Sequence, residues 1–258
     1  MDIFFAPYHD DQCCLCGSSE SLTGEHKIKA SALRKIFGND AMVIGKFDGK
    51  SKPRPAQGPK SSAFHFAVPL CASCNSTRTQ APDCEFDRFH ALVSTSLATG
   101  RTPDEVFNMR EYEIGSEPYL NVFRYFAKLL CCHVAESGGP RPLAVSEFAL
   151  GNMDRNVVLL HIDADPIYAA YESSLGENRF AGHGGLIVPV DAETELATGF
   201  RSSIILGAVR YIFFVRFDSM VGRELRTYHH DFWLKCEAAY RDAVANPISE
   251  EQRYFLGV

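Results

Sequence analysis

The sequence predicts an α+β protein with a small N-terminal module in residues 1–98 and a larger mixed region in residues 99–258. Two observations predict this division. Two CxxC pairs lie in the first part, whereas the second part has a long helical pattern followed by segments rich in β-branched and aromatic residues. Between the two parts, Gly100-Arg101-Thr102-Pro103 has the composition of a linker.

The first feature along the chain is the pair of cysteine motifs, Cys13-x-x-Cys16 and Cys71-x-x-Cys74. Four thiolates arranged as a tetrahedron close a structural zinc site. Cys14 is excluded from this set because only Cys13 leaves two residues before Cys16. The spacer of 54 residues between the pairs exceeds the roughly 15–20 residues of compact zinc sites, so an inserted segment is expected there.

The rest of the N-terminal module alternates strands and helices. Glycine, asparagine and proline separate the predicted elements, because these residues favour turns and helix ends. The helix that starts at Ala30 is expected to stop at Gly38-Asn39, a typical C-cap sequence. The predicted elements are strands at 22–26, 41–47 and 63–69 and helices at 30–37 and 82–97, with a polar loop at 48–62.

The C-terminal region begins with an amphipathic helical pattern and continues with strands. The helix over residues 118–135 is expected to end before Gly138-Gly139-Pro140. Further along, β-branched and aromatic residues favour strands at 156–162, 185–190 and 203–217, and a last helix is expected at 231–244.

Composition favours a soluble intracellular protein. Residues 1–5 lack the basic segment and the long apolar run of a signal peptide. The longest apolar stretch, Ile204–Val215, is short and contains Arg210, so no membrane span is predicted. Four of the nine cysteines lie in CxxC pairs, which indicates metal binding rather than a disulfide framework. We therefore expect a cytoplasmic protein without a membrane partner.

Charge is distributed unevenly along the chain. The whole sequence carries a net charge of −6, yet residues 27–60 contain nine basic residues against two acidic ones. Such a local excess attracts phosphates, although a solvated lysine-rich loop has the same composition. The residues of this stretch selected as candidate nucleic-acid contacts are Lys46, Lys50, Lys52, Arg54 and Lys60.

Three segments of the N-terminal module together resemble the HNH endonucleases, in the subgroup whose ββα-metal core is braced by two CxxC zinc knuckles. The resemblance covers roughly the first 90 of the 258 residues and implies an enzyme that hydrolyses phosphodiester bonds. The matching segments are Cys13-Cys14-Leu15-Cys16-Gly17, Leu22-Thr23-Gly24-Glu25-His26 and Leu70-Cys71-Ala72-Ser73-Cys74-Asn75-Ser76-Thr77-Arg78.

The resemblance implies a role for each residue of the candidate site. His26 takes the position of the general base, and Glu25 and Asn75 take positions that ligate the catalytic metal. Arg78 matches a basic position that contacts phosphate. Beside the resemblance, a histidine titrates near neutral pH and suits proton abstraction, and carboxylate and amide oxygens favour Mg²⁺ or Mn²⁺ over zinc.

The sequence departs from the family pattern at two positions. Glu25 stands where most members have aspartate, and no asparagine lies between Asn39 and Asn75, where the residue that orients the base is expected. His65 is the nearest polar candidate, and it either orients His26, binds metal or faces solvent. Because adjacent strand residues point to opposite faces, Glu25 and His26 need a local distortion or a strand end to act on one substrate.

Two functions are compatible with these residues. The first is a metal-dependent HNH endonuclease that cuts DNA, with RNA as an alternative substrate. Its C-terminal region would select a target or a partner protein. Its size resembles that of bacterial or phage restriction and defence nucleases. The second is a zinc-stapled module that binds nucleic acid or protein without cutting it. Glu25, His26 and Asn75 favour the nuclease, because a binding module has no use for a base beside two oxygen ligands.

Overall fold

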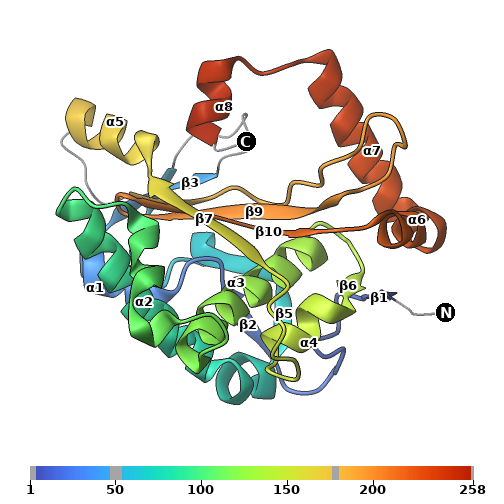
Figure 1. Ribbon diagram of the computed structural model, residues 1–258, viewed down its shortest axis with the longest axis horizontal. Helices are drawn as coiled ribbons and strands as arrows, with labels where there is room; N and C mark the ends of the chain where they lie inside the picture. The colour runs from blue at the N-terminus through green and yellow to red at the C-terminus, as the bar shows by residue number, and fades with distance from the viewer. Residues whose placement is uncertain (1–3, 47–53, 176–179, 257–258) are drawn as a thin grey trace.

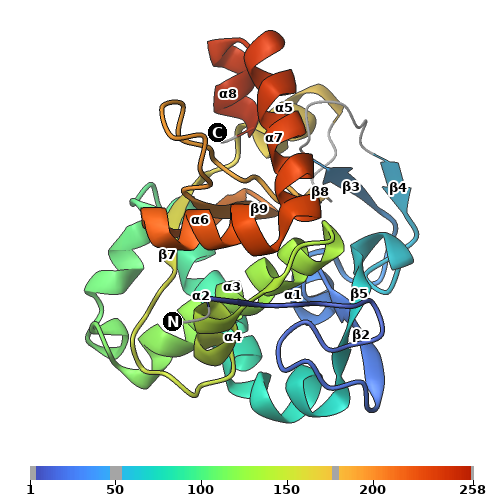
Figure 2. The ribbon, with the colours of Figure 1, turned by 90° about the vertical axis from the view of Figure 1, so that its right-hand side faces the viewer.

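The computed structural model describes residues 4–46, 54–175 and 180–256 and has a mixed α and β architecture. Its helices are α1 (Ala30–Phe37), α2 (Gln80–Ala98), α3 (Glu117–Glu136), α4 (Leu143–Ala149), α5 (Pro166–Leu175), α6 (Ser219–Tyr228), α7 (His230–Ala245) and α8 (Glu250–Leu256). In Figure 1 and Figure 2, α2, α3 and α4 lie on one side of a central sheet, and α5, α7 and α8 lie on the other. The α+β class predicted from the sequence is confirmed.

The central sheet has six strands in the order β4-β3-β8-β9-β10-β7. β3 and β8 are parallel, and the other neighbours are antiparallel. The strands are β3 (Met42–Lys46), β4 (Arg54–Ala56), β7 (Leu159–Ala164), β8 (Phe180–His183), β9 (Gly199–Leu206) and β10 (Val209–Arg216). β3 and β4 belong to the predicted N-terminal module, whereas β7, β8, β9 and β10 belong to the predicted C-terminal region. The two regions therefore share one sheet.

Two smaller sheets lie outside the central one. β2 (Leu22–His26) pairs antiparallel with β5 (His65–Cys71), and β1 (Phe5–Ala6) pairs with β6 (Arg141–Pro142). A π-helical segment, Ser73–Arg78, leads from β5 into α2. The segment inserted between the two CxxC pairs thus contains β2, α1, β3, β4 and most of β5.

The strand predicted over residues 203–217 is wrong as a single element. β9 and β10 form a hairpin whose two-residue turn is Gly207-Ala208. Gly207 has φ +60°, a left-handed conformation that glycine adopts without steric cost and that tight hairpin turns require. The strand predicted over 185–190 is also wrong, because this segment makes only isolated bridges, at Ile187 and Val190.

Helix α3 lies at the centre of the core. Every residue from Leu120 to Ala135 is buried, so the amphipathic pattern predicted for this helix does not produce an exposed face. Some of its polar residues are buried with charged partners, as Arg124 is by its ion pairs with Glu117 and Asp154. The helix packs against α2, α4 and β5 and so joins the two predicted regions of the chain. Within the described ranges, no helix combines the length and the apolar character needed to cross a membrane.

Candidate functional site

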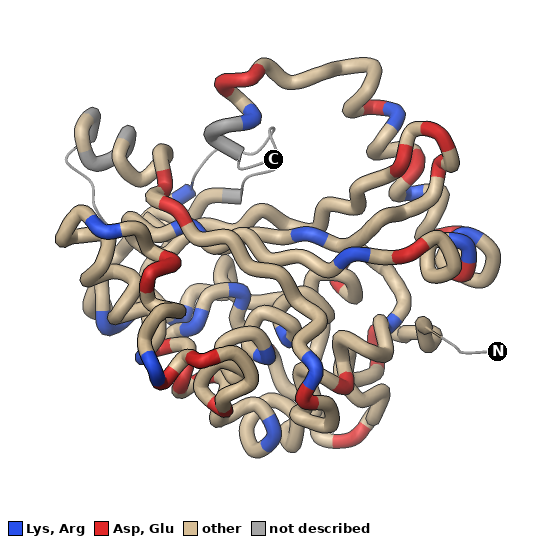
Figure 3. Tube along the Cα trace, viewed as in Figure 1, with Lys and Arg blue, Asp and Glu red and all other residues tan. Residues whose placement is uncertain are grey.

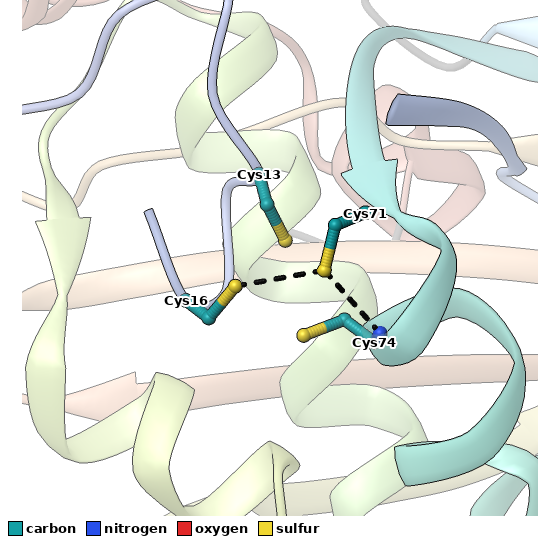
Figure 4. Close-up of side chains that lie close together, drawn as sticks. All are labelled: Cys13, Cys16, Cys71 and Cys74. Atoms are coloured by element: carbon teal, nitrogen blue, oxygen red, sulfur yellow. Dashed lines mark hydrogen bonds between the residues drawn. The ribbon is translucent and has the colours of Figure 1, made fainter. Parts of the chain in front are cut away.

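Four cysteine side chains from two parts of the chain converge at the end of β5 (Figure 4). All four sulfur atoms lie within 4.8 Å of one another, and the Sγ atoms of Cys16 and Cys71 are 3.6 Å apart. A tetrahedral zinc ion with Zn–S bonds of about 2.3 Å requires sulfur separations of about 3.8 Å. Cys13, Cys16, Cys71 and Cys74 are therefore positioned to hold a metal ion, and four thiol ligands fit structural zinc.

The backbone turns tightly around both pairs. Gly17 has φ +78°, and a Cβ atom at this position would lie 3.0 Å from the guanidinium of Arg141. The left-handed conformation favours glycine after the first pair, whereas the flexible end of the Arg141 side chain could move away from a Cβ atom. In the second pair, the backbone N–H of Cys74 donates to Sγ of Cys71 at 3.5 Å.

Cys14 does not belong to this cluster, as predicted from the spacing. Its Sγ atom lies 3.5 Å from Sγ of Cys132, and both side chains are buried. Cys131, Cys132 and His133 are buried in α3, so they contribute to the core.

His26 and His65 face each other across the β2–β5 ladder. The two residues are register partners, and their ring centroids are 3.9 Å apart. The register is irregular between Gly24 and His26, which is the local distortion that the adjacent Glu25 and His26 were expected to need. The ring of His65 is half-buried and contacts the His26 ring.

The environment of His26 keeps its imidazole neutral. Burial is the main reason that the pKa of His26 falls to about 4, and the nearby His65, Arg34 and Lys128 also lower it. Within the described chain, Nε2 of His26 is buried and has no hydrogen-bond partner. Such an atom is costly unless a further group binds it. A pKa of about 4 makes this imidazole a weaker base than the near-neutral histidine expected from the sequence, although its Nε2 can still form one hydrogen bond with a bound molecule.

Glu25 is buried and forms a salt bridge with a lysine from the C-terminal region. Its Oε1 atom lies 2.9 Å from Nζ of Lys128, and the same Nζ lies 2.7 Å from Oδ1 of Asp83 in α2. Burial raises the pKa of Glu25, while the ammonium of Lys128 opposes this shift. Burial lowers the pKa of Lys128, but the two carboxylates outweigh it and raise that pKa overall.

Lys128 is not among the residues predicted from the sequence. A lysine inside the apolar run of residues 120–134 was the available signal, because lysine is rarely fully buried without a charged partner. Asp83, in turn, lies in the first turn of α2 rather than at its N-cap, and it uses its carboxylate for Lys128.

Asn75 lies next to the same part of β2. Its Nδ2 atom donates to Oγ1 of Thr23 and to the carbonyl oxygen of Gly24, both at 2.9 Å. These hydrogen bonds use the amide nitrogen, so the amide oxygen of Asn75 is the atom available as a metal ligand. Asn75 and His65 thus contact β2 within residues 23–26, whereas the carboxylate of Glu25 pairs with Lys128 of α3.

Three of the candidate nucleic-acid contacts, Arg54, Lys60 and Arg78, have side chains that the structure describes. Arg78 donates from Nη2 to Oδ1 of Asn152 at 2.9 Å, and Arg54 and Lys60 are exposed. Lys and Arg positions are interspersed with Asp and Glu positions along the described trace (Figure 3). Outside the described residues lie Lys50, Lys52 and the side chain of Lys46.

Two kinds of metal site were expected, and their ligand sets differ. In the described part of the chain, the cysteine cluster is the only group of three or more Cys, His, Asp or Glu side chains close enough to share an ion. Glu25 and Asn75 offer one carboxylate and one amide oxygen. Mg²⁺ commonly binds through one or two carboxylates and keeps several water ligands, so this smaller donor set is compatible with Mg²⁺ or Mn²⁺.

Comparison with known proteins identifies no relative: no family model, no curated protein and no solved structure matches this chain.

Proposed function

We propose that this chain is a metal-dependent HNH endonuclease that hydrolyses phosphodiester bonds in DNA. The observation that carries the proposal is the contact of a neutral His26 with His65 across the β2–β5 ladder, beside Glu25 and Asn75. An imidazole whose Nε2 has no hydrogen-bond partner among the described residues, together with a carboxylate and an amide from neighbouring positions, supplies the group types that a hydrolytic centre uses.

The frame around these residues supports the same proposal. β2 and β5 form an antiparallel pair that α2 follows in the chain, and this order agrees with the one that the HNH resemblance implies. The cysteine cluster joins the end of β5 to the N-terminal loop, so a bound zinc ion would brace the two strands that carry the histidines.

Each side chain has one task in this proposal. His26 accepts the proton of the attacking water, and His65 orients the His26 ring. Glu25 and Asn75 would hold the divalent ion, which supplies positive charge beside the scissile phosphate when it is bound. The basic residues assigned to backbone phosphates are Arg78, Arg54 and Lys60, together with Lys46, Lys50 and Lys52.

Plasmid cleavage by the zinc-loaded protein with Mg²⁺ or Mn²⁺ tests this function. His26→Ala is expected to lower the cleavage rate by about 10²–10⁴-fold, because it removes proton abstraction. His161→Ala is the matched control, since the side chain of His161 on β7 is 63% exposed and belongs to the central sheet. Equal cleavage by His26→Ala and the wild-type protein would refute the assigned role of His26.

The second candidate function is a zinc-stapled module that binds nucleic acid or protein without cutting it. The salt bridge between Lys128 and Glu25 favours this alternative, because the ammonium already partly neutralises the carboxylate assigned to the metal. Retention of DNA or RNA in a gel-shift assay, with no cleavage under Mg²⁺ or Mn²⁺, is the result that would select it.

A further inference from the structure

The ammonium group of Lys128 lies between two carboxylates that come from different elements. Nζ is 2.9 Å from Glu25 on β2 and 2.7 Å from Asp83 on α2, while Lys128 itself belongs to α3. The side chain of Lys128 is 1% exposed, and those of Glu25 and Asp83 are 10% and 19% exposed. Three elements that are distant in sequence therefore meet at one buried ion-pair cluster.

Charge balance in this cluster leaves Glu25 with capacity for another cation. One ammonium faces two carboxylates, so the three groups together carry one negative charge when all are ionised. The salt bridge reaches Glu25 through Oε1, and a carboxylate has a second oxygen that can bind a cation at the same time. Asp83 supplies the compensating charge that a fully buried lysine needs, which makes the contact with Glu25 less costly.

The surroundings hold the ammonium in a fixed place. α3 is buried along its length, and Nζ of Lys128 also lies 5.5 Å from the centre of the Tyr125 ring. Asp83 is held in turn, because the side chain of Lys29 donates to its backbone carbonyl and forms a 2.7 Å salt bridge with Asp87. A hydrogen-bond partner that cannot move fixes the orientation of the carboxylate that it contacts.

We propose that Lys128 is the positioning residue of the metal site: it holds the Oε1 atom of Glu25 and so directs the second carboxylate oxygen toward a divalent cation. This inference depends on the proposed function, because it takes Glu25 as a metal ligand. It adds that a residue of the C-terminal region completes the site of the N-terminal module. The nuclease function of residues 1–98 then requires α3.

The test measures Mn²⁺ affinity of the zinc-loaded, full-length protein by electron paramagnetic resonance, without any substrate. Lys128→Met is expected to bind Mn²⁺ about 10–100-fold more weakly than the wild type, the usual effect of removing a group that orients a metal ligand. Arg124→Met is the matched control. Arg124 lies one turn earlier in α3, is also buried and also pairs with two carboxylates, so its loss disturbs the helix without touching Glu25.

The outcomes separate this inference from the proposed function. A folded, zinc-containing Lys128→Met protein with wild-type Mn²⁺ affinity overturns the positioning role of Lys128 and leaves the nuclease function untouched. A tighter Mn²⁺ affinity also overturns the positioning role, because it shows that the ammonium competes with the ion. If the wild type binds Mn²⁺ through Glu25 but cuts no nucleic acid, the nuclease function fails and the positioning role stands. A wild type that binds no Mn²⁺ overturns both.

A second measurement uses the wild-type fold in case Lys128→Met does not fold. Mn²⁺ broadens nuclear magnetic resonances close to it, so stoichiometric Mn²⁺ is expected to broaden the side-chain signals of Lys128 in the wild type. Glu25→Gln is expected to abolish this broadening, because the amide is a weaker ligand than the carboxylate. Unbroadened Lys128 signals in Mn²⁺-bound wild type contradict the inference.

Discussion

Replacing His90 with asparagine tests whether a buried, neutral histidine makes this fold sensitive to acid. His90 in α2 is 4% exposed, and its Nδ1 atom lies 2.7 Å from the hydroxyl of Tyr211 on β10. Burial is the main reason that its pKa falls to about 4 from the usual 6.5, with Lys35 lowering it and Asp87 opposing. His90→Asn keeps an amide near Tyr211 but has no group that titrates.

The size of the pH-dependent loss in unfolding free energy follows from the pKa values of His90 in the folded and unfolded chain. Between about pH 6.5 and pH 4 the unfolded chain binds a proton at His90 that the folded chain does not bind. Protonation therefore does not favour unfolding above pH 6.5, and it lowers the unfolding free energy progressively as the pH falls below that value. From pH 7 to pH 5, this linkage removes about 2 kcal/mol from the unfolding free energy of the wild type. His90→Asn lacks this loss, although its smaller side chain lowers stability equally at every pH.

Urea unfolding of both proteins at pH 5, 6 and 7 measures the difference. The cysteine cluster and the remaining histidines respond to acid in both proteins, so their contributions cancel when the two pH profiles are subtracted. The expected result is a drop between pH 7 and pH 5 that is about 2 kcal/mol larger in the wild type than in His90→Asn. Parallel profiles would show that His90 is not held neutral, and the argument from its burial would be wrong.

Two further predictions concern metal and nucleic acid. Cys71→Ser is expected to lose the single bound zinc ion and most of the stability of the β2–β5 region, since structural zinc sites supply folding free energy directly. Elemental analysis measures the zinc content, and chelator-induced unfolding measures the stability. A Cys71→Ser protein that folds and retains one zinc ion would contradict the four-thiolate site. The double variant Arg54→Gln/Lys60→Gln is expected to weaken binding to DNA of every sequence, and to reduce the steepness of log affinity against log salt concentration by about one unit per lost phosphate contact. The double variant Arg223→Gln/Arg226→Gln on α6 removes the same net charge elsewhere and is the control. An unchanged slope would mean that Arg54 and Lys60 contact only solvent.

Local patterns in the sequence were enough to predict several elements. The strand at Leu22–His26 and the helix at Ala30–Phe37 have the predicted bounds, and a signal such as the glycine at the end of the helix acts over neighbouring residues. Over residues 203–217 the same kind of pattern predicted one strand, because the apolar and aromatic residues continue on both sides of the turn at Gly207. Periodicity identifies strand-forming residues, but a two-residue turn interrupts it too briefly to be seen.

The sequence by itself determined the cysteine set of this protein, because the CxxC spacing leaves one choice of four ligands and the fold brings those four sulfur atoms together. Only the tertiary structure decided what surrounds Glu25 and His26. The contact of His26 with His65 depends on the register of two strands, and the salt bridge of Glu25 with Lys128 depends on how α3 packs against β5. Such contacts join residues far apart in the chain, and a buried charge selects its partner through packing rather than through spacing in the sequence.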